Sequence, residues 1–297
     1  MGSGETILIA GGSGLLGAPV ARALDREGYR IRILTRRPDR EPPRRDGYEV
    51  VRGDVEDEAS LERALAGCMG VHVSLRAGPT RESFDRVEHH GTARVARLAR
   101  ASGVRRLTYL SGMYVAGAAH LDRPAADEAK AAAEAAIRDS GVAHTIFRPT
   151  YFIETLPRHL RGGRAVVIGR QPHPLHMIAA DDYARMVARA YALDEAADRT
   201  FYVQGREAFT IKEALDLYCR IVGPAMRVVT VPIPVMRIID RLFMTGELGP
   251  TLDLMEVMQR TGEVGDPAPA WAVLGPPTTT LRAWCEARAT DRQALSP

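Results

Sequence analysis

The stretch ILIAGGSGLLGAPVARAL, residues 7–24, decides the fold class. It begins as a short buried-strand pattern, passes through Gly11, Gly14 and Gly17, and continues with the apolar spacing of a helix. A strand, a tight glycine turn and a helix in this order are typical of the βαβ unit that opens a dinucleotide-binding domain. Free amides at the start of such a helix, together with its dipole, favour phosphate. We therefore expect the turn to hold a diphosphate through Gly11, Gly12, Ser13, Gly14, Leu15, Leu16 and Gly17.

Strand and helix patterns alternate through the first half of the chain. Such alternation predicts a parallel sheet covered on both faces, with right-handed crossovers between its strands. The fold class is therefore α/β, a Rossmann-type doubly wound parallel sheet. The expected strands are 6–10, 30–34, 48–51, 71–75, 106–111 and 144–147, and the expected helices lie near 58–67, 83–102 and 124–140.

The second half is less regular. Later strands are expected at 165–168 and 200–203, with a helix at 181–192 between them, and the chain beyond reads as mostly helical. We assign residues 1–155 to the dinucleotide-binding core. Residues 156–297 then supply the remaining sheet elements and a small, mostly helical substrate lobe, and the two parts interleave into one globular unit.

Composition narrows the possible partners and compartment. The 297 residues carry 40 basic and 37 acidic side chains, a balance that gives no support to nucleic-acid binding. The three cysteines show neither a disulfide framework nor metal-ligand spacing, which favours a reducing compartment. No apolar run reaches the ~18 residues of a membrane span, and no signal peptide is visible. We expect a cytoplasmic protein, a monomer or homodimer, without a metal or membrane partner.

The glycine spacing and several later segments resemble one family. The turn reads G-x-x-G-x-x-G, as in extended and atypical short-chain dehydrogenase/reductases. VRGDVEDEASLERALAGC (51–68), GTARVARLARASGVRRLTYLSG (91–112) and HTIFRPTYFIETL (144–156) are similar to later segments of that family. The resemblance covers about residues 5–215 and is closest to the NmrA-like and isoflavone-reductase-like branch. It implies a nicotinamide dinucleotide cofactor and an oxidoreductase.

The resemblance also implies further cofactor contacts. Asp54 and Val55 would lie beside the adenine. The segment after the fourth strand would pass the ribose and phosphates, although Arg76 there could equally lie in solvent. The loop after the sixth strand would run beneath the nicotinamide and wall the substrate pocket. These two segments contribute Ser74, Leu75, Arg76, Pro149, Tyr151 and Phe152.

The second strand ends in basic residues, and this decides the choice of coenzyme. A free ribose 2′-hydroxyl is usually held by a carboxylate at this position. Here the strand runs into Arg36 and Arg37, and the first carboxylate is Asp39. Two guanidinium groups suit a 2′-phosphate, which they hold by charge-assisted hydrogen bonds. We predict a preference for NADP(H) over NAD(H).

The expected reaction site departs from the family pattern. The resemblance places Ser111 and Lys130 at the family's serine and lysine, but Ala126 stands where the proton-transferring tyrosine would be. Lys130 itself could act as the acid or base, with desolvation lowering its pKa. Tyr114 could supply a phenol instead, or no protein acid is needed. The plainer reading of Lys130 is a surface pair with Glu134.

Three functions follow. The first is an NADP(H)-dependent oxidoreductase that acts on a small, apolar or aromatic, carbonyl or conjugated substrate. The second is a non-catalytic NADP(H)-binding sensor or assembly protein, favoured by the missing tyrosine. The third is an epimerase or isomerase with bound cofactor. His89 and His90 carry no metal-site prediction, because adjacent helical side chains are expected to point in different directions.

Overall fold

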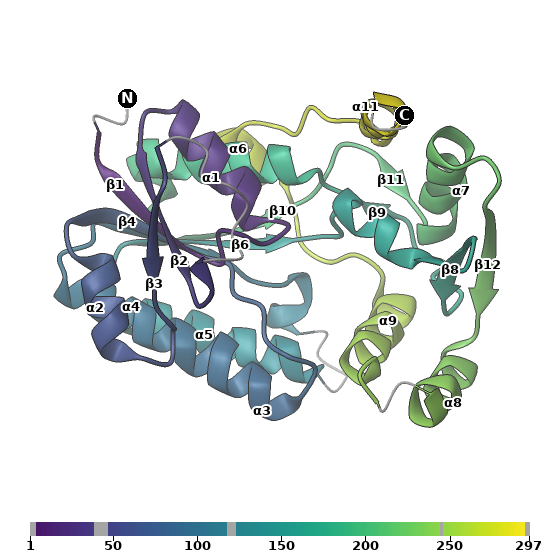
Figure 1. The fold of residues 1–297 in the computed structure, drawn as a ribbon, viewed down its shortest axis with the longest axis horizontal. Helices are drawn as coiled ribbons and strands as arrows, with labels where there is room; N and C mark the ends of the chain where they lie inside the picture. Colours follow the sequence, from purple (N-terminus) through teal and green to yellow (C-terminus); the bar gives the residue numbers. More distant parts are fainter. Residues whose placement is uncertain (1–3, 39–46, 118–122, 244–245, 295–297) are drawn as a thin grey trace.

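The computed structural model describes residues 4–38, 47–117, 123–243 and 246–294 (Figure 1). Its centre is a seven-stranded parallel sheet with the order β10-β6-β5-β4-β1-β2-β3. The order reverses between β1 and β4, which places the ligand crevice of a doubly wound sheet at their carboxyl ends. The strands are β1 (Thr6–Ala10), β2 (Arg30–Thr35), β3 (Glu49–Arg52), β4 (Cys68–Val73), β5 (Arg106–Leu110), β6 (His144–Pro149) and β10 (Arg199–Val203).

Helices cover both faces of this sheet (Figure 1). One face packs on α1 (Gly17–Arg26), α6 (Ala180–Ala192) and α10 (Ala268–Leu274). The other packs on α2 (Glu58–Leu65), α4 (Thr92–Ala101) and α5 (Ala125–Asp139). Each helix buries an apolar stripe, and the strands between them are apolar on both faces, as parallel strands require. The predicted Rossmann-type fold is confirmed.

Strand β4 shows why one predicted boundary was wrong. The pattern placed its start at residue 71, but it pairs with β1 from Cys68 onward. Gly70 interrupts the apolar run and lies opposite Ile7, where a side chain would collide with the ring of Tyr191. Gly70 is therefore part of the strand, and the packed ring of Tyr191 leaves no room for a larger residue at this position.

The helix predicted near 83–102 has three parts. It begins with α3 (Arg81–Ser83), where Thr80 and Ser83 form a capping box. It continues as the π-helix η2 (Phe84–Gly91) and only then becomes the α-helix α4. A π-helical segment shifts the residues that follow relative to an α-helix, and such segments are frequent at functional sites. This one places Glu88 toward the interior.

The C-terminal lobe has its own core at the other end of the molecule (Figure 1). Strand β12 (Arg227–Val231), which the sequence did not predict, pairs with β8 (Arg164–Ile168), and β8 pairs with β7 (Leu160–Arg161). A second small sheet joins β9 (Leu175–His176) to β11 (Ala208–Phe209). The lobe's helices are α7 (Ile211–Val222), α8 (Ile233–Phe243), α9 (Gly249–Thr261) and α11 (Leu281–Ala294). The described residues also form the short helices η3 (Met113–Ala116), η4 (Ile153–His159) and η5 (Asp194–Ala196). None of the helices in the described ranges is both long and apolar enough to cross a bilayer.

Candidate functional site

The turn between β1 and α1 fits only glycine at two positions. Gly11 has a φ of +95°, and a β-carbon there would collide with the carbonyl oxygen of Ser74 on the neighbouring strand end. A β-carbon on Gly17 would collide with the carbonyl oxygen of Gly11. The start of α1 therefore packs directly on the turn. With no side chains at these glycines, a ligand at the carboxyl end of β1 can approach the backbone of the turn closely.

The turn also leaves hydrogen-bond donors free. The amide of Gly14 donates to the carbonyl of Gly11 at 3.0 Å. Within the described residues, the amides of Ser13, Leu15 and Leu16 donate to no protein acceptor. Unpaired amides at the positive end of a helix form an anion site. These residues fit a dinucleotide's diphosphate.

A groove of about 510 Å³, here called the cofactor groove, runs from this turn across the ends of β2, β3 and β4. It brings together ten of the predicted cofactor residues: Gly11, Ser13, Gly14, Arg36, Arg37, Asp54, Val55, Ser74, Leu75 and Arg76. The other four turn residues do not line it. A side chain on Gly12 would run into Ile33, and Leu16 lines a second cavity, described below.

Arg36 and Arg37 lie exposed where β2 ends. Neither forms an ion pair with a carboxylate in the described part of the chain, and the amide of Arg37 donates to the hydroxyl of Thr35 at 3.2 Å. Asp39 falls outside the described residues. The two guanidinium groups are thus available to an anionic ligand at the groove's edge.

A second cavity, of about 390 Å³, is here called the reaction cavity. Its wall is mostly apolar, with Phe84 from η2 and Leu254 and Met258 from α9. The remaining predicted site residues all line it: Ser111, Tyr114, Lys130, Pro149, Tyr151 and Phe152. The structure therefore brings the predicted catalytic residues together beside the loop that was expected beneath the nicotinamide. Ala126 lines the same cavity and offers no proton.

Lys130 is paired inside the protein with Glu88, and not with the Glu134 of the alternative interpretation. Its Nζ lies 2.9 Å from Oε2 of Glu88, with side chains 19% and 8% exposed. Burial by itself would lower the pKa of Lys130, but the charges of Glu88 and Asp127 outweigh this and leave it above the ordinary value. The expectation of a lowered pKa was wrong, because the sequence did not reveal the buried carboxylate. The amine is held as a fixed cation.

The alternative interpretation of Lys130, a surface pair with Glu134, is wrong. Glu134 is buried and binds Arg148 through two hydrogen bonds, of 2.6 and 2.9 Å. It also accepts one from Arg138 and a 2.6 Å bond from the hydroxyl of Ser111. Burial would raise the pKa of Glu134, but these donors hold it below its usual value. The Ser111 hydroxyl thus donates its hydrogen bond to the buried Glu134 carboxylate and not to a ligand in the cavity.

Tyr114 is anchored in a similar way. Its hydroxyl donates a 2.6 Å hydrogen bond to the carbonyl oxygen of Gly262, just after α9. Burial, followed by the charges of Asp127 and Glu263, raises the pKa of the phenol. The ring lines the reaction cavity, while the hydroxyl ties η3 to the C-terminal lobe.

Asp127 is a site residue that the sequence reasoning missed. It lines the reaction cavity, is 6% exposed, and its Oδ2 has no hydrogen-bond partner in the described structure. A β-carbon on Gly112 would lie 2.8 Å from its Oδ1, so the glycine makes room for the carboxyl. Burial raises its pKa from 3.8 to about 6, although Lys130 opposes the shift. Its position three residues before Lys130 on one helix was the available signal.

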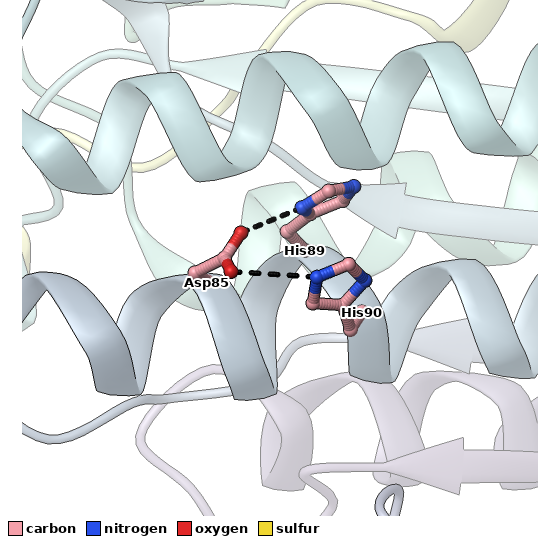
Figure 2. A group of neighbouring side chains, drawn as sticks. All are labelled: Asp85, His89 and His90. Atoms are coloured by element: carbon pink, nitrogen blue, oxygen red, sulfur yellow. Dashed lines mark hydrogen bonds and ion pairs between the residues drawn. The ribbon is translucent and has the colours of Figure 1, made fainter.

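Three potential metal ligands converge on the exposed side of η2 (Figure 2). Asp85 Oδ1 lies 2.7 Å from His89 Nδ1, and Asp85 Oδ2 lies 3.3 Å from His90 Nε2. The two rings stack with centroids 4.2 Å apart. The premise that these histidines point in different directions was therefore wrong, because the π-helix and the shared aspartate bring them together. The described groups already satisfy one another as a hydrogen-bonded cluster.

Comparison with known proteins identifies the family. A family described as NAD(P)H-binding matches residues 11–193. The (4-alkanoyl-5-oxo-2,5-dihydrofuran-3-yl)methyl phosphate reductase of Streptomyces griseus subsp. griseus is 33% identical over 228 residues, covering 74% of this chain and 75% of that protein. The photosystem II assembly factor Ycf39 of Trieres chinensis is 22% identical over 244 residues, covering 80% of this chain and 76% of that one.

Solved structures show the same fold. The NADPH-dependent quinone oxidoreductase QOR2 of Escherichia coli, complexed with NADPH, superposes with a TM-score of 0.71 and 21% identity. The match covers 95% of this chain and 99% of that one. With the glycine turn, the parallel sheet and the family match in place, the chain belongs to the NAD(P)H-binding family.

Proposed function

We propose that this protein is an NADP(H)-dependent reductase that acts on a small conjugated carbonyl compound. The observation that carries the proposal is the juxtaposition of Lys130 and Asp127, a buried cation and a buried carboxyl, in one apolar cavity. That cavity lies beside the segment Pro149–Phe152, which the family resemblance places under the nicotinamide. A bound NADPH supplies a hydride to such a compound.

The coenzyme is held by main-chain and basic groups. The free amides of the turn at residues 11–17 take the diphosphate, and Arg36 and Arg37 take the 2′-phosphate of NADPH. Lys130 and the loop after β6 would hold the opposite, nicotinamide end of the coenzyme. The preference for NADP(H) depends on the two arginines.

Lys130 acts as a fixed positive charge. Its pKa lies above the ordinary value, so the amine keeps its proton through the reaction and Glu88 holds it in place. A cation pre-positioned in an apolar cavity stabilises negative charge that develops on a substrate carbonyl oxygen. Ser111 and Tyr114 shape the cavity, since their hydroxyls are engaged by Glu134 and Gly262.

Asp127 takes the place of the missing tyrosine as proton donor. Its pKa of about 6 lets it carry a proton at mildly acidic pH. Oδ2 is buried and has no hydrogen-bond partner in the described structure, so no other group of that part of the protein holds the proton. The ionised carboxyl that remains is stabilised by Lys130 and regains a proton from water. Ala126 lines the same cavity as Asp127.

The cavity also supports the class of substrate. Its apolar wall suits an alkyl or aromatic body, and the two charged groups suit a single polar end. The Streptomyces griseus relative is named as a reductase of an (alkanoyl-oxo-dihydrofuranyl)methyl phosphate, in which an alkanoyl chain and a phosphate ester are attached to a conjugated carbonyl ring.

The test is a titration with NADPH followed by a screen of enones and aldehydes for loss of nicotinamide absorbance. The wild type is compared with Lys130→Ala, Asp127→Asn and the control Arg100→Ala, an exposed arginine on α4 away from both cavities. The proposal expects turnover in the wild type and the control and a loss of at least about 100-fold in the two site variants. Turnover that survives both substitutions would count against it.

One observation favours a second function, a non-catalytic NADP(H)-binding protein. Position 126 is alanine, and the hydroxyls of Ser111 and Tyr114 are tied to other parts of the protein. The Ycf39 relative is an assembly factor. Micromolar or tighter NADPH binding with no turnover across the whole panel would select this function instead.

A further inference from the structure

We propose that the substrate carries a phosphate monoester, and that this group binds in a separate arginine-lined cavity next to the reaction cavity. The inference rests on the proposed function, because it assigns the rest of the substrate to the reaction cavity. Two observations carry it: the arginine-lined cavity adjoins the reaction cavity, and the charges around the arginine-lined cavity leave an excess of positive charge.

The arginine-lined cavity next to the reaction cavity is here called the arginine cavity and has a volume of about 650 Å³. Three guanidinium groups line it, from Arg81, Arg123 and Arg260. Pro124 and Pro250 line both this cavity and the reaction cavity, so the two adjoin across the starts of α5 and α9. Two neighbouring residues of α9 line different cavities: Val257 lines the arginine cavity and Met258 lines the reaction cavity. The proposed substrate extends across this shared border, with one end in each cavity.

The acidic residues of the arginine cavity are already neutralised. Asp253 and Glu256 line it, but Arg237, outside its wall, lies 2.9 Å from the first and 2.8 Å from the second. Arg260 also lies 2.6 Å from Glu256. These contacts cancel the negative charge at the α9 side. They leave the arginines on the α5 side to set the sign of the potential.

On the α5 side, the positive charge is in excess. Arg81 pairs with Glu128, an exposed pair that contributes little by itself. Arg123 is exposed and forms no ion pair with any carboxylate in the described ranges. Asp127, the other acid in the first turn of α5, points into the reaction cavity. Among the described residues, Arg123 is therefore an arginine without an ion-pair partner where the two cavities adjoin, and its charge opposes the rise that burial causes in the pKa of Asp127.

The ends of two helices add to this charge. Both α5 and α9 begin at the cavity wall, at Ala125 and Gly249, so the positive ends of both helix dipoles face it. An arginine fork binds two phosphate oxygens at once, which a lone ammonium cannot do. A phosphate beside Arg123 would thus be held by charge and by geometry, with the apolar body in the reaction cavity.

The experiment measures binding, so it does not depend on turnover. Naphthyl phosphate and naphthol are each titrated calorimetrically into the protein saturated with NADP⁺, for the wild type, Arg123→Ala and the control Arg100→Ala. We expect naphthyl phosphate to bind the wild type at least about tenfold more tightly than naphthol. Arg123→Ala should remove this advantage and leave naphthol binding unchanged, and Arg100→Ala should change neither.

Two results would overturn the inference. One is equal affinity of the wild type for the two compounds, including the case in which neither binds. The other is an unchanged advantage for the phosphate in Arg123→Ala. Reduction of uncharged enones by the same preparation would show that the proposed reductase function stands even where the phosphate site fails.

Discussion

The Nζ of Lys130 lies 2.9 Å from Glu88 on the π-helix η2, although Glu134 stands one turn away on the lysine's own helix. The pair crosses from α5 to η2 and is almost fully buried. It fixes the cation that the proposed reaction needs and ties two helices together at the floor of the reaction cavity.

Breaking this ion pair should destabilise the protein. Glu88→Gln leaves a buried ammonium without its counter-charge, which costs about 3–5 kcal/mol of unfolding free energy. The double variant Glu88→Gln with Lys130→Met should recover most of that loss, because the unpaired charge is gone. Urea unfolding at neutral pH measures both. A single variant within about 1 kcal/mol of the wild type would show that the pair is not buried in solution.

Asp127 should give the stability a distinct pH dependence. Its folded-state pKa of about 6 lies above the ordinary 3.8, so between these values the folded state binds more protons than the unfolded state. Stability should therefore fall as pH rises from about 4 to 6, by about 2–3 kcal/mol from this group. Asp127→Asn should abolish this slope. Parallel pH profiles for the two proteins would contradict the burial of this carboxyl.

The same residue should govern the pH profile of turnover. A donor must be protonated, so the rate of the wild type should decline above pH about 6. In Asp127→Asn the residual rate should be low and lose this decline. Stopped-flow oxidation of NADPH from pH 5 to 8 provides the comparison, and a decline that persists in the variant would assign it to another group.

Arg36 and Arg37 should decide between the coenzymes. Alanine at both positions removes the groups that face a 2′-phosphate, so the Kd for NADPH should rise at least about tenfold while the Kd for NADH stays within about twofold. Fluorescence titration with each coenzyme measures the two constants. Equal losses for both coenzymes would mean that the arginines do not contact the 2′-phosphate.

Tyr114→Phe separates an anchoring phenol from a catalytic one. The variant loses the hydrogen bond to Gly262 and should be less stable by about 1 kcal/mol. Its turnover per folded molecule should stay close to that of the wild type. A loss of more than about tenfold in kcat at full folding would instead make Tyr114 the acid.

The sequence predicted the fold because its signals are local. The glycine turn, the six apolar strands and the helices between them each follow from spacing, and all are present. The unpredicted β12 is a short, half-buried strand whose partner β8 is far away in sequence, so no local pattern identifies the pair.

The candidate site was predictable only in part, for a related reason. The residues that line its two cavities follow the family pattern, so Ser111 and Lys130 could be placed. The groups that pair with these residues could not be predicted from the sequence. Glu88 reaches Lys130 because a π-helix changes the register of its segment. Arg148, on strand β6, binds Glu134 of helix α5.

Titration calorimetry of the purified protein with NADPH and with NADH tests the central claim most directly. The glycine turn and the groove predict a single site per chain, with NADPH bound more tightly than NADH. Gly17→Ala should weaken both coenzymes, because its β-carbon would push α1 away from Gly11. The absence of heat with either coenzyme, in a protein shown to be folded, would contradict the account.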